Sequence, residues 1–292
     1  MSRTGNDSRT LVNAAQLNRT RYRVVLVVVV LLFTAAFVGP VYLLVTDGLK
    51  GTTEAIRTPP TFYPHQVAAG NYRDAWDRLD IARLLLNTLW YAFGALAFQL
   101  VLDVAAAYSL SKLRPVLGNA VLALMLATLM IPAMVLVVPQ YLTVLDLPLL
   151  HLNLLDTPWA IWLPSVANAF NIYLLKRFFD SVPKELLDSA AIDGAGPLRT
   201  LTAIVLPMSR PIIGVVSIFA LVNVWKDFLW PLLAEPDPAK QTLNAGIYSL
   251  SLGVPENVLI AAAAISALPT VLFFLVFQRS IMSGLTAGSL KG

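Results

Sequence analysis

Long apolar runs without charge dominate the pattern of hydrophobic and polar positions along this chain. A hydrocarbon core of about 30 Å needs about 20 helical residues, because each residue rises by about 1.5 Å. Six stretches reach or approach that length: residues 24–45, 84–102 with an extension past Asp103 to about 111, 116–145, 157–175, 211 to about 234, and 258–278. The pattern predicts an all-α fold, a polytopic membrane helix bundle with about six transmembrane helices.

Prolines and charges interrupt some of these runs. Pro132 and Pro139 predict kinks in the third run, since proline removes a helical hydrogen bond. Lys226 and Asp227 interrupt the fifth run. The expected organisation is a polar tail over residues 1–23, one transmembrane domain over residues 24–283 and a short tail over residues 284–292.

Composition supports a membrane protein over a soluble one. Apolar residues make up 57% of the chain and charged residues 13%, whereas soluble domains carry roughly 25% charged residues. The mean hydropathy is +0.70. The net charge of +4 predicts no nucleic-acid partner, because the basic residues are dispersed and form no stripe. With no cysteine and two distant histidines, His65 and His151, the sequence predicts neither a disulfide nor a metal site.

The basic residues also predict the orientation. The first run, at 22 residues, is too long for a signal peptide and is interpreted as a retained anchor. With the N-terminus in the cytoplasm, 14 of the 21 basic residues lie on inner segments, and the outer segment 146–156 has none. The positive-inside rule therefore predicts a multi-pass protein of the cell membrane with both termini in the cytoplasm. The outer segment 46–83 either covers the external mouth or is a passive cap.

Residues 176–210 form the inner loop between the fourth and fifth runs. Asp180, Ser181 and Pro183 predict the start of a short helix, because short polar side chains cap free amides and proline suits the first turn. Glu185 and Asp188, three residues apart, then share one face of that helix. The loop is expected to carry an acidic helix on the cytoplasmic side.

A glycine turn follows that helix. The alanines at 190–191 are small enough for another surface to approach closely, and Gly194 and Gly196 stop the helix. A second short helix over residues 198–205 is expected to run into Pro207. The resulting helix, turn and helix suits a projecting knob that fits a partner. The alternative is an amphipathic interfacial helix that lies on lipid without a partner.

The spacing of this loop resembles the EAA loop of permeases in ATP-binding-cassette (ABC) importers. In that family the loop is the coupling helix that docks into the cytoplasmic ATPase. The resemblance implies coupling roles for Glu185, Asp188, Ser189, Ala190, Asp193, Gly194, Ile204, Leu206 and Pro207. This sequence has Asp188 where glutamate is usual and Ser189 where alanine is usual, so the carboxylate reach is shorter by one methylene.

Further landmarks resemble the carbohydrate-importing, MalG-like branch of that family. They are Asn87 to Tyr91 (NTLWY), Ala107 to Leu110 (AYSL), Lys176 to Asp193 (KRFFDSVPKELLDSAAID), Asp227 to Leu232 (DFLWPL) and Gln278 to Gly292 (QRSIMSGLTAGSLKG). The last stretch is similar to the family's C-terminal tail, which reaches toward the ATPase dimer interface. The resemblance implies that role for Gly284, Leu285, Thr286, Gly288 and Lys291. It also implies that the segment 235–257 reaches toward an external binding protein, the alternative being an ordinary connector.

The resemblance also implies partners and a function. The chain is expected to be the permease subunit of a prokaryotic importer that moves a sugar inward. Its expected protein partners are a homologous second permease, a dimer of ATP-binding subunits and an extracytoplasmic solute-binding protein. It is also expected to be embedded in the lipid bilayer. The sequence has no glycine-rich loop ending in Gly-Lys-Ser or Gly-Lys-Thr. ATP and magnesium are therefore expected on the partner ATPase, with no cofactor in this chain and no enzymatic activity of its own.

Polar residues within the apolar runs are candidates for the substrate pathway. Sugars need fixed amide or carboxylate groups for their hydroxyls and aromatic rings for their C–H faces. The candidates are Asp103, Asn168, Asn171, Tyr173, Lys226 and Asp227. The alternative is a structural role, with asparagines joining helices and aromatic residues in interfacial belts.

Lys226 is a departure from the family pattern, in which asparagine is expected before the Asp-Phe pair. An ammonium group at mid-membrane costs about 2.5 kcal/mol or more unless it is paired or hydrated, and Asp103 or a cavity water is a possible partner. A self-sufficient secondary transporter or channel is the alternative function, and it would normally show matching half-repeats. A membrane enzyme would need a convergent nucleophile, base or metal site, which the sequence does not suggest.

Overall fold

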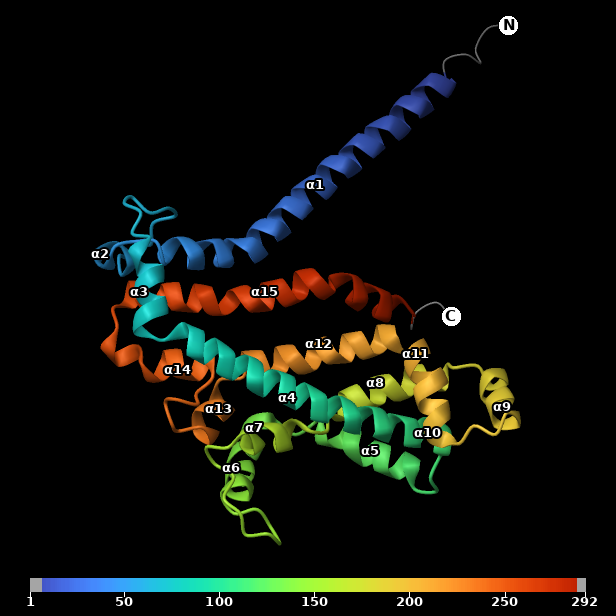
Figure 1. Cartoon of the computed structure of the whole chain (residues 1–292). Helices are drawn as coiled ribbons and strands as arrows, with labels where there is room; N and C mark the ends of the chain where they lie inside the picture. Colours follow the sequence, from blue (N-terminus) through green and yellow to red (C-terminus); the bar gives the residue numbers. More distant parts are fainter. Residues whose placement is uncertain (1–6, 288–292) are drawn as a thin grey trace, which may run out of the picture. The chain divides into compact units, whose positions relative to one another are not determined.

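The computed structural model describes the backbone of residues 7–287 and the side chains of residues 19 and 21–278. The chain divides into two units, which are described separately. Within the described range, the first unit contains residues up to Arg73 together with Pro255–Ala264, and the second contains the remainder. Both consist of helices and loops, and the described residues form no strand beyond an isolated bridge between Leu147 and Leu152 (Figure 1).

The first unit begins with the long helix α1 (Asp7–Asp47). This helix starts well before residue 24, so it extends into the region expected to be a polar tail. Its apolar part, Arg21–Asp47, is long enough to cross a membrane, and no residue of its 18-residue apolar stretch is buried. A helix that is apolar and exposed on all sides needs lipid or a partner chain around it.

Hydrogen bonds organise the segment that follows α1, which contains α2 (Thr52–Ala55) and the start of α3 (Gly70–Arg78). The Asn71 carboxamide donates to the carbonyl oxygens of Gly48, at 2.9 Å, and Lys50, at 2.8 Å. Its oxygen accepts from Asn257, at 2.8 Å, in the first turn of α15 (Glu256–Ala287). One buried amide thereby joins three parts of the first unit.

The second unit is built around α4 (Ile81–Tyr108), along which α7, α8, α12 and α14 pack (Figure 1). The buried positions of α4 recur every three or four residues, as one helix face toward a core requires. Besides the helices of the loop 176–210, this unit contains η1 (Ser109–Leu113), α5 (Gly118–Thr128), α6 (Ala133–Leu145), α7 (Pro158–Ser165), α8 (Ala169–Asp180), α12 (Arg210–Lys226), α13 (Leu229–Ala234), α14 (Leu243–Ser249), the 3-10 turn η3 (Ser251–Gly253) and the remainder of α15.

Tryptophan side chains fix the core between α4, α7 and α13. The Trp162 indole donates to the Tyr91 carbonyl oxygen at 3.2 Å, and the Trp230 indole donates to the Ala160 carbonyl oxygen at 2.9 Å. The Trp162 ring lies against Gly94, where an added Cβ would be 2.3 Å from the ring. Glycine is therefore required for this close approach of α7 to α4.

The two ends of α4 contact two different loop regions. Near its start, the Asn87 carboxamide donates to the carbonyl oxygens of Ala239 and Gln241, at 2.9 and 3.0 Å. Near its end, the Tyr108 hydroxyl donates to the Pro197 carbonyl oxygen at 2.9 Å. The loop after α13 and the loop 176–210 thus lie at opposite ends of one helix of 28 residues, a length that can cross a bilayer.

The expected count of six spanning helices is not confirmed. Among the described residues, three uninterrupted helices are long and apolar enough to cross a membrane: Arg21–Asp47, Ile81–Leu113 and Glu256–Gln278. The count rises to five if each of two bent pairs is one span. These pairs are Gly118–Thr128 with Ala133–Leu145, bent by 106°, and Pro197–Met208 with Arg210–Lys226, bent by 83°.

Local chemistry explains the breaks. Pro132 precedes α6 with extended ψ, so the expected kink is a sharp break, whereas Pro139 lies inside α6. The fourth expected run, 157–175, is divided between α7 and α8, because Asn168 caps a new helix by accepting from the Asn171 amide at 3.1 Å. The fifth run is interrupted at Lys226 and Asp227, as the sequence predicted, because Asp227 is extended between α12 and α13.

Candidate functional site: a projecting loop and a polar cavity

Helix α9 (Lys184–Ile192) forms the first half of the loop between α8 and α12. The sequence correctly predicted a helix here, but the predicted cap was wrong. Ser181 instead follows the last turn of α8, which continues to Asp180, and Pro183 stands at the start of α9 with no side-chain cap. Helix α8 continues beyond residue 175 to Asp180, whose carboxylate accepts hydrogen bonds from Ser111 and Lys176 and does not cap α9.

The glycine turn has the conformation that the sequence predicted. Gly194 has φ +74°, in the left-handed region that L residues rarely adopt, and an added Cβ would meet nothing within 4 Å. Gly196 has an ordinary φ of −72°. The turn therefore depends on glycine for its backbone conformation at residue 194 only.

The second half of the loop extends further than expected. It comprises α10 (Pro197–Thr200), the π-helix η2 (Leu201–Val205) and α11 (Leu206–Met208), so the helix does not stop before Pro207. In η2 the Leu206 amide bonds to the Leu201 carbonyl, five residues back. A π-turn shifts the hydrogen-bond pattern just before the proline, which has no amide hydrogen to donate.

The expected coupling residues have different environments. Glu185, Asp188 and Asp193 are exposed and form no ion pair within the described part of the chain. Ser189, Gly194 and Pro207 are also exposed, Ile204 and Leu206 are half-buried, and Ala190 is buried. Large apolar side chains flank the turn, with Ile192 86% and Leu198 73% exposed. The loop therefore presents acids and apolar groups together, and Figure 1 shows α9 at the edge of its unit.

The base of the loop is attached to the end of α4 and to η1 (Ser109–Leu113). The Ser111 hydroxyl and the Lys176 ammonium donate to the two oxygens of Asp180, at 2.7 and 2.8 Å. Burial favours the neutral acid, but these hydrogen bonds outweigh it and hold the pKa of Asp180 below its ordinary value. With the bond from Tyr108 to Pro197, both halves of the loop are joined to the same helix end.

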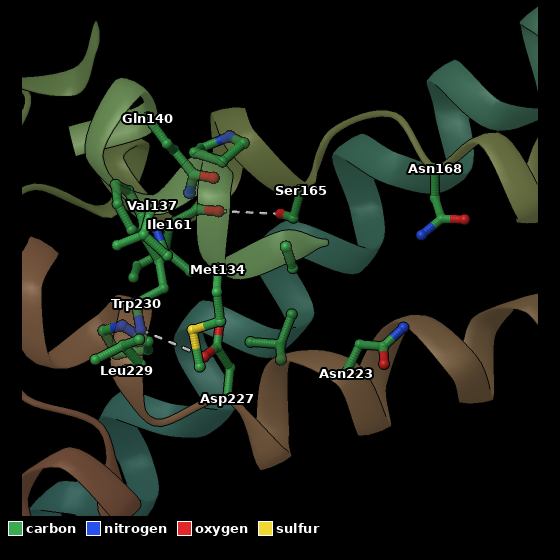
Figure 2. Close-up of a pocket in the computed structure, with 14 residues that line it drawn as sticks. Met134, Val137, Gln140, Ile161, Ser165, Asn168, Asn223, Asp227, Leu229 and Trp230 are labelled. Carbon is green, nitrogen blue, oxygen red and sulfur yellow. Dashed lines mark hydrogen bonds between the residues drawn. The ribbon is translucent and has the colours of Figure 1, made fainter. Parts of the chain in front are cut away.

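A cavity of about 500 Å³ opens among α6, α7, α12 and α13. Its polar groups come from Gln140, Ser165, Asn168, Asn223 and Asp227, and the remaining lining is apolar or aromatic, including Met134 and Trp230 (Figure 2). Figure 2 shows that Asn168, just before α8, and Asn223, on α12, border the same space. Neutral amides and a few fixed polar groups beside apolar surface suit a polyhydroxylated ligand.

A second cavity of about 330 Å³ adjoins the first, because Asn168 and Asn223 line both. The second cavity also contains Lys226 and the rings of Phe170 and Phe219. The two ring centroids are 6.1 Å apart. The cavities therefore differ in charge, since an acid lines the first and a base lines the second.

The six expected pathway residues separate into two groups. Asn168, Asn171, Lys226 and Asp227 line one or both cavities, whereas Asp103 and Tyr173 line neither. Asp103 is fully buried and accepts from the Asn168 amide at 3.0 Å, so it supports the break between α7 and α8.

Sequence reasoning missed Gln140, Ser165 and Asn223. Each lies in a largely apolar run, and their isolation among apolar neighbours was the available signal. Of the expected C-terminal tail, residues 284–286 fall within the backbone of α15, and Gly288 and Lys291 lie outside the described residues.

Comparisons with known proteins identify the class. The family of binding-protein-dependent transport system inner membrane components matches residues 99–285. The chain is 31% identical to the sulfoquinovosyl glycerol transport system permease protein SmoH of Agrobacterium fabrum, over 87% of this chain and 88% of that protein. It is 29% identical to the melibiose/raffinose/stachyose import permease protein MelC of Bacillus subtilis, over 94% and 99% of the two chains.

A solved structure supports the same fold. A bacterial ABC transporter involved in the import of the acidic polysaccharide alginate contains a chain that superposes with a TM-score of 0.74 at 20% identity, covering 96% of this chain and 98% of that one. These findings define a helical, multi-pass membrane component of an importer. The chain belongs to the family of binding-protein-dependent transport system inner membrane components and is a permease subunit of the ABC importer type.

Proposed function

We propose that this permease carries a carbohydrate into the cytoplasm and that the two adjoining cavities form part of its path. Relatives at about 30% identity are named for glycosides and oligosaccharides. The amides of Gln140, Asn168 and Asn223 offer donors and acceptors for sugar hydroxyls, and Trp230 offers an aromatic surface. The cavities lie among helices that break at caps and prolines, which is typical of transporter binding sites.

The loop 180–207 is the proposed coupling element, and it carries the argument for an external energy source. Its exposed acids and apolar side chains have no partner within the described chain, while its base is hydrogen-bonded to the end of α4. A rigid projection of this kind transmits movement of a docked partner to the helix that holds it. In this proposal the partner is an ATPase dimer in the cytoplasm, which holds ATP and magnesium.

The complete importer also contains a homologous second permease and an extracytoplasmic solute-binding protein. A related alginate importer has been solved with a pentasaccharide-bound periplasmic protein, which supports this arrangement. In the proposed orientation both termini are cytoplasmic, the loop 180–207 faces the ATPase, and the loop after α13 faces the binding protein. That loop contacts the start of α4, at the end remote from the coupling loop.

Purification of the assembled importer tests the proposal directly. We expect this chain to co-purify with a separate ATPase and to support uptake into proteoliposomes only when ATP and a sugar-loaded binding protein are present. A panel of binding proteins loaded with different sugars, scored by stimulation of ATP hydrolysis, would identify the substrate class. Full uptake by this chain alone, without ATP, would instead establish a self-sufficient transporter.

The glycine turn provides a sharper test of coupling. Gly194→Leu places a large side chain on an open surface and imposes a strained backbone of about 1–2 kcal/mol, so uptake should fall at least tenfold while membrane insertion persists. Gly196→Ala is the matched control, because Gly196 has open space and an ordinary φ. Asparagine adopts the left-handed conformation more readily than leucine, so Gly194→Asn adds a side chain with less backbone strain and distinguishes the effect of size from that of strain. Wild-type uptake by Gly194→Leu would reject the coupling role.

A further inference from the structure

We propose that the second cavity, which contains Lys226, binds an acidic group on the transported carbohydrate. The acidic group is a carboxylate, sulfonate or phosphate carried by the sugar. This inference rests on the proposed function, because it assigns a substrate class to the same path. It makes Lys226 a residue that determines specificity.

The side chain of Lys226 lacks an anionic partner in the described part of the chain. It ends α12, is exposed to the cavity and forms no ion pair within 4 Å. Asp103, the partner considered from the sequence, instead accepts from the Asn168 amide. Lys226 therefore lines this cavity as a cation with no ion pair among the described residues.

The neighbouring acid, Asp227, has a different task. Its carboxylate accepts from the backbone amide of Trp230 at 3.4 Å, which places it at the start of α13 (Figure 2). It lines the first cavity, whereas Lys226 lines the second. Adjacent residues of opposite charge thus line adjoining cavities.

The rest of the second cavity suits a sugar that carries a negative charge. The carboxamides of Asn168 and Asn223 offer hydrogen-bond donors, and Phe170 and Phe219 offer ring surfaces for C–H groups. No acidic side chain is among the described residues that line this cavity. Its volume of about 330 Å³ lies within the range of small-ligand sites.

Energetics favour this assignment over a neutral sugar alone. A lysine at the centre of a membrane segment is strongly unfavourable, and such residues usually line aqueous paths or pair with an opposite charge. An amide could bond to hydroxyls without that penalty. A cation that faces an open cavity gains from a bound anion in a way that an amide does not.

A thiol reporter tests the inference in the assembled importer. The chain has no cysteine, so Val222→Cys places a single thiol of this subunit in the cavity wall. Its labelling rates are measured with the anionic 2-sulfonatoethyl and the cationic 2-trimethylammonioethyl methanethiosulfonates, relative to a free thiol in solution. We expect the cavity to favour the anionic reagent, and Lys226→Gln to reduce the ratio of rates on the order of tenfold. Lys226→Arg, which keeps the charge, should retain the ratio.

Protection from labelling then identifies the ligand chemistry. Glucuronate should slow the reaction of the thiol, whereas methyl glucoside at the same concentration should have a weaker effect, and Lys226→Gln should remove the difference. An anion-to-cation ratio equal to that of a free thiol, or unchanged by Lys226→Gln, would overturn the inference and indicate that another subunit neutralises Lys226. A thiol that reacts with neither reagent would contradict the proposed path itself. Equal, rapid labelling by both reagents would leave the path intact and reject only the anion site.

Discussion

Around Lys50 and Asn71, at the end of α1 and the start of α3, charged and amide groups are buried, whereas the loop 180–207 leaves most of its charged groups exposed. In the first, the Lys50 ammonium is 1% exposed and bonds to the Asp47 carboxylate and the Thr61 carbonyl. In the second, Asp188 and Ile192 are exposed and have no partner in the described chain. The buried groups around Lys50 thus find their partners within this chain, whereas the exposed groups of the loop have none in the described chain and are available to the proposed ATPase partner.

This difference follows from what each group requires. A buried polar group without a hydrogen bond is strongly unfavourable, so the segment that contains Lys50 must supply every partner itself. An exposed acid is hydrated by water and stays available for a partner that arrives later. Polar groups at the base of the loop are paired, which keeps the projection rigid while its tip stays open.

The largest expected effect comes from breaking the buried pair. Lys50→Met leaves the Asp47 carboxylate and the Thr61 carbonyl without their donor, so the free energy of unfolding should fall by about 2–4 kcal/mol. Thermal unfolding of the purified importer measures the change. Lys240→Met is the control, since Lys240 is about half exposed. Equal stability of the two variants would show that the buried network around Lys50 is not stabilising.

An intermediate effect is expected at the tip of the loop, and it should appear in binding instead of stability. Ile192→Ser combined with Leu198→Ser removes exposed apolar surface, so affinity for the ATPase should fall about tenfold while the unfolding temperature stays unchanged. Co-purification and ATPase stimulation measure the first, and thermal unfolding measures the second.

Leu187→Ser is the contrasting control for these tip variants. Leu187 lies on the same helix as Ile192 but is partly buried and packs against the core cluster that contains Ile172 and Phe179, so this variant should lower stability. If the tip variants lowered stability as much as Leu187→Ser, the tip would be part of the core and the comparison between the two segments would fail.

The smallest effect is expected at the base of the loop and depends on pH. Asp180→Asn should lower stability by about 1 kcal/mol at neutral pH, because it removes a charge-assisted contact with Lys176 that is partly exposed to solvent. The folded pKa of Asp180 lies below the unfolded value near 4, so this contribution is present above about pH 4 and is lost as pH falls through the folded pKa.

Unfolding measured between pH 3 and pH 7 checks this dependence. Asp188→Asn serves as the control, since Asp188 is exposed on the same loop and has no ion pair in the described chain. A difference between wild type and Asp180→Asn that grows below pH 4 would contradict the assignment.

The hydrophobic pattern predicted the membrane class and the first, second and sixth apolar helices, and the two glycines predicted the position of the turn. These features depend on local composition and backbone conformation: long apolar runs require lipid, and Gly194 has the φ angle that glycine adopts readily. The third to fifth runs were harder to predict. The break in the fourth run depends on Asn168 and Asp103, which meet only after the chain has folded.

By itself, the sequence determined that this protein spans a membrane and carries an exposed acidic loop with a tight turn, because composition and turn chemistry act between near neighbours. Only the tertiary structure decided which polar residues share a space. Gln140, Asn168 and Asn223 lie on separate elements, and their amides border one cavity because α6, α7 and α12 pack around it. It also decided that the Asp227 carboxylate accepts from the Trp230 amide at the start of α13, whereas Lys226 lines the second cavity. Both placements depend on where α12 ends.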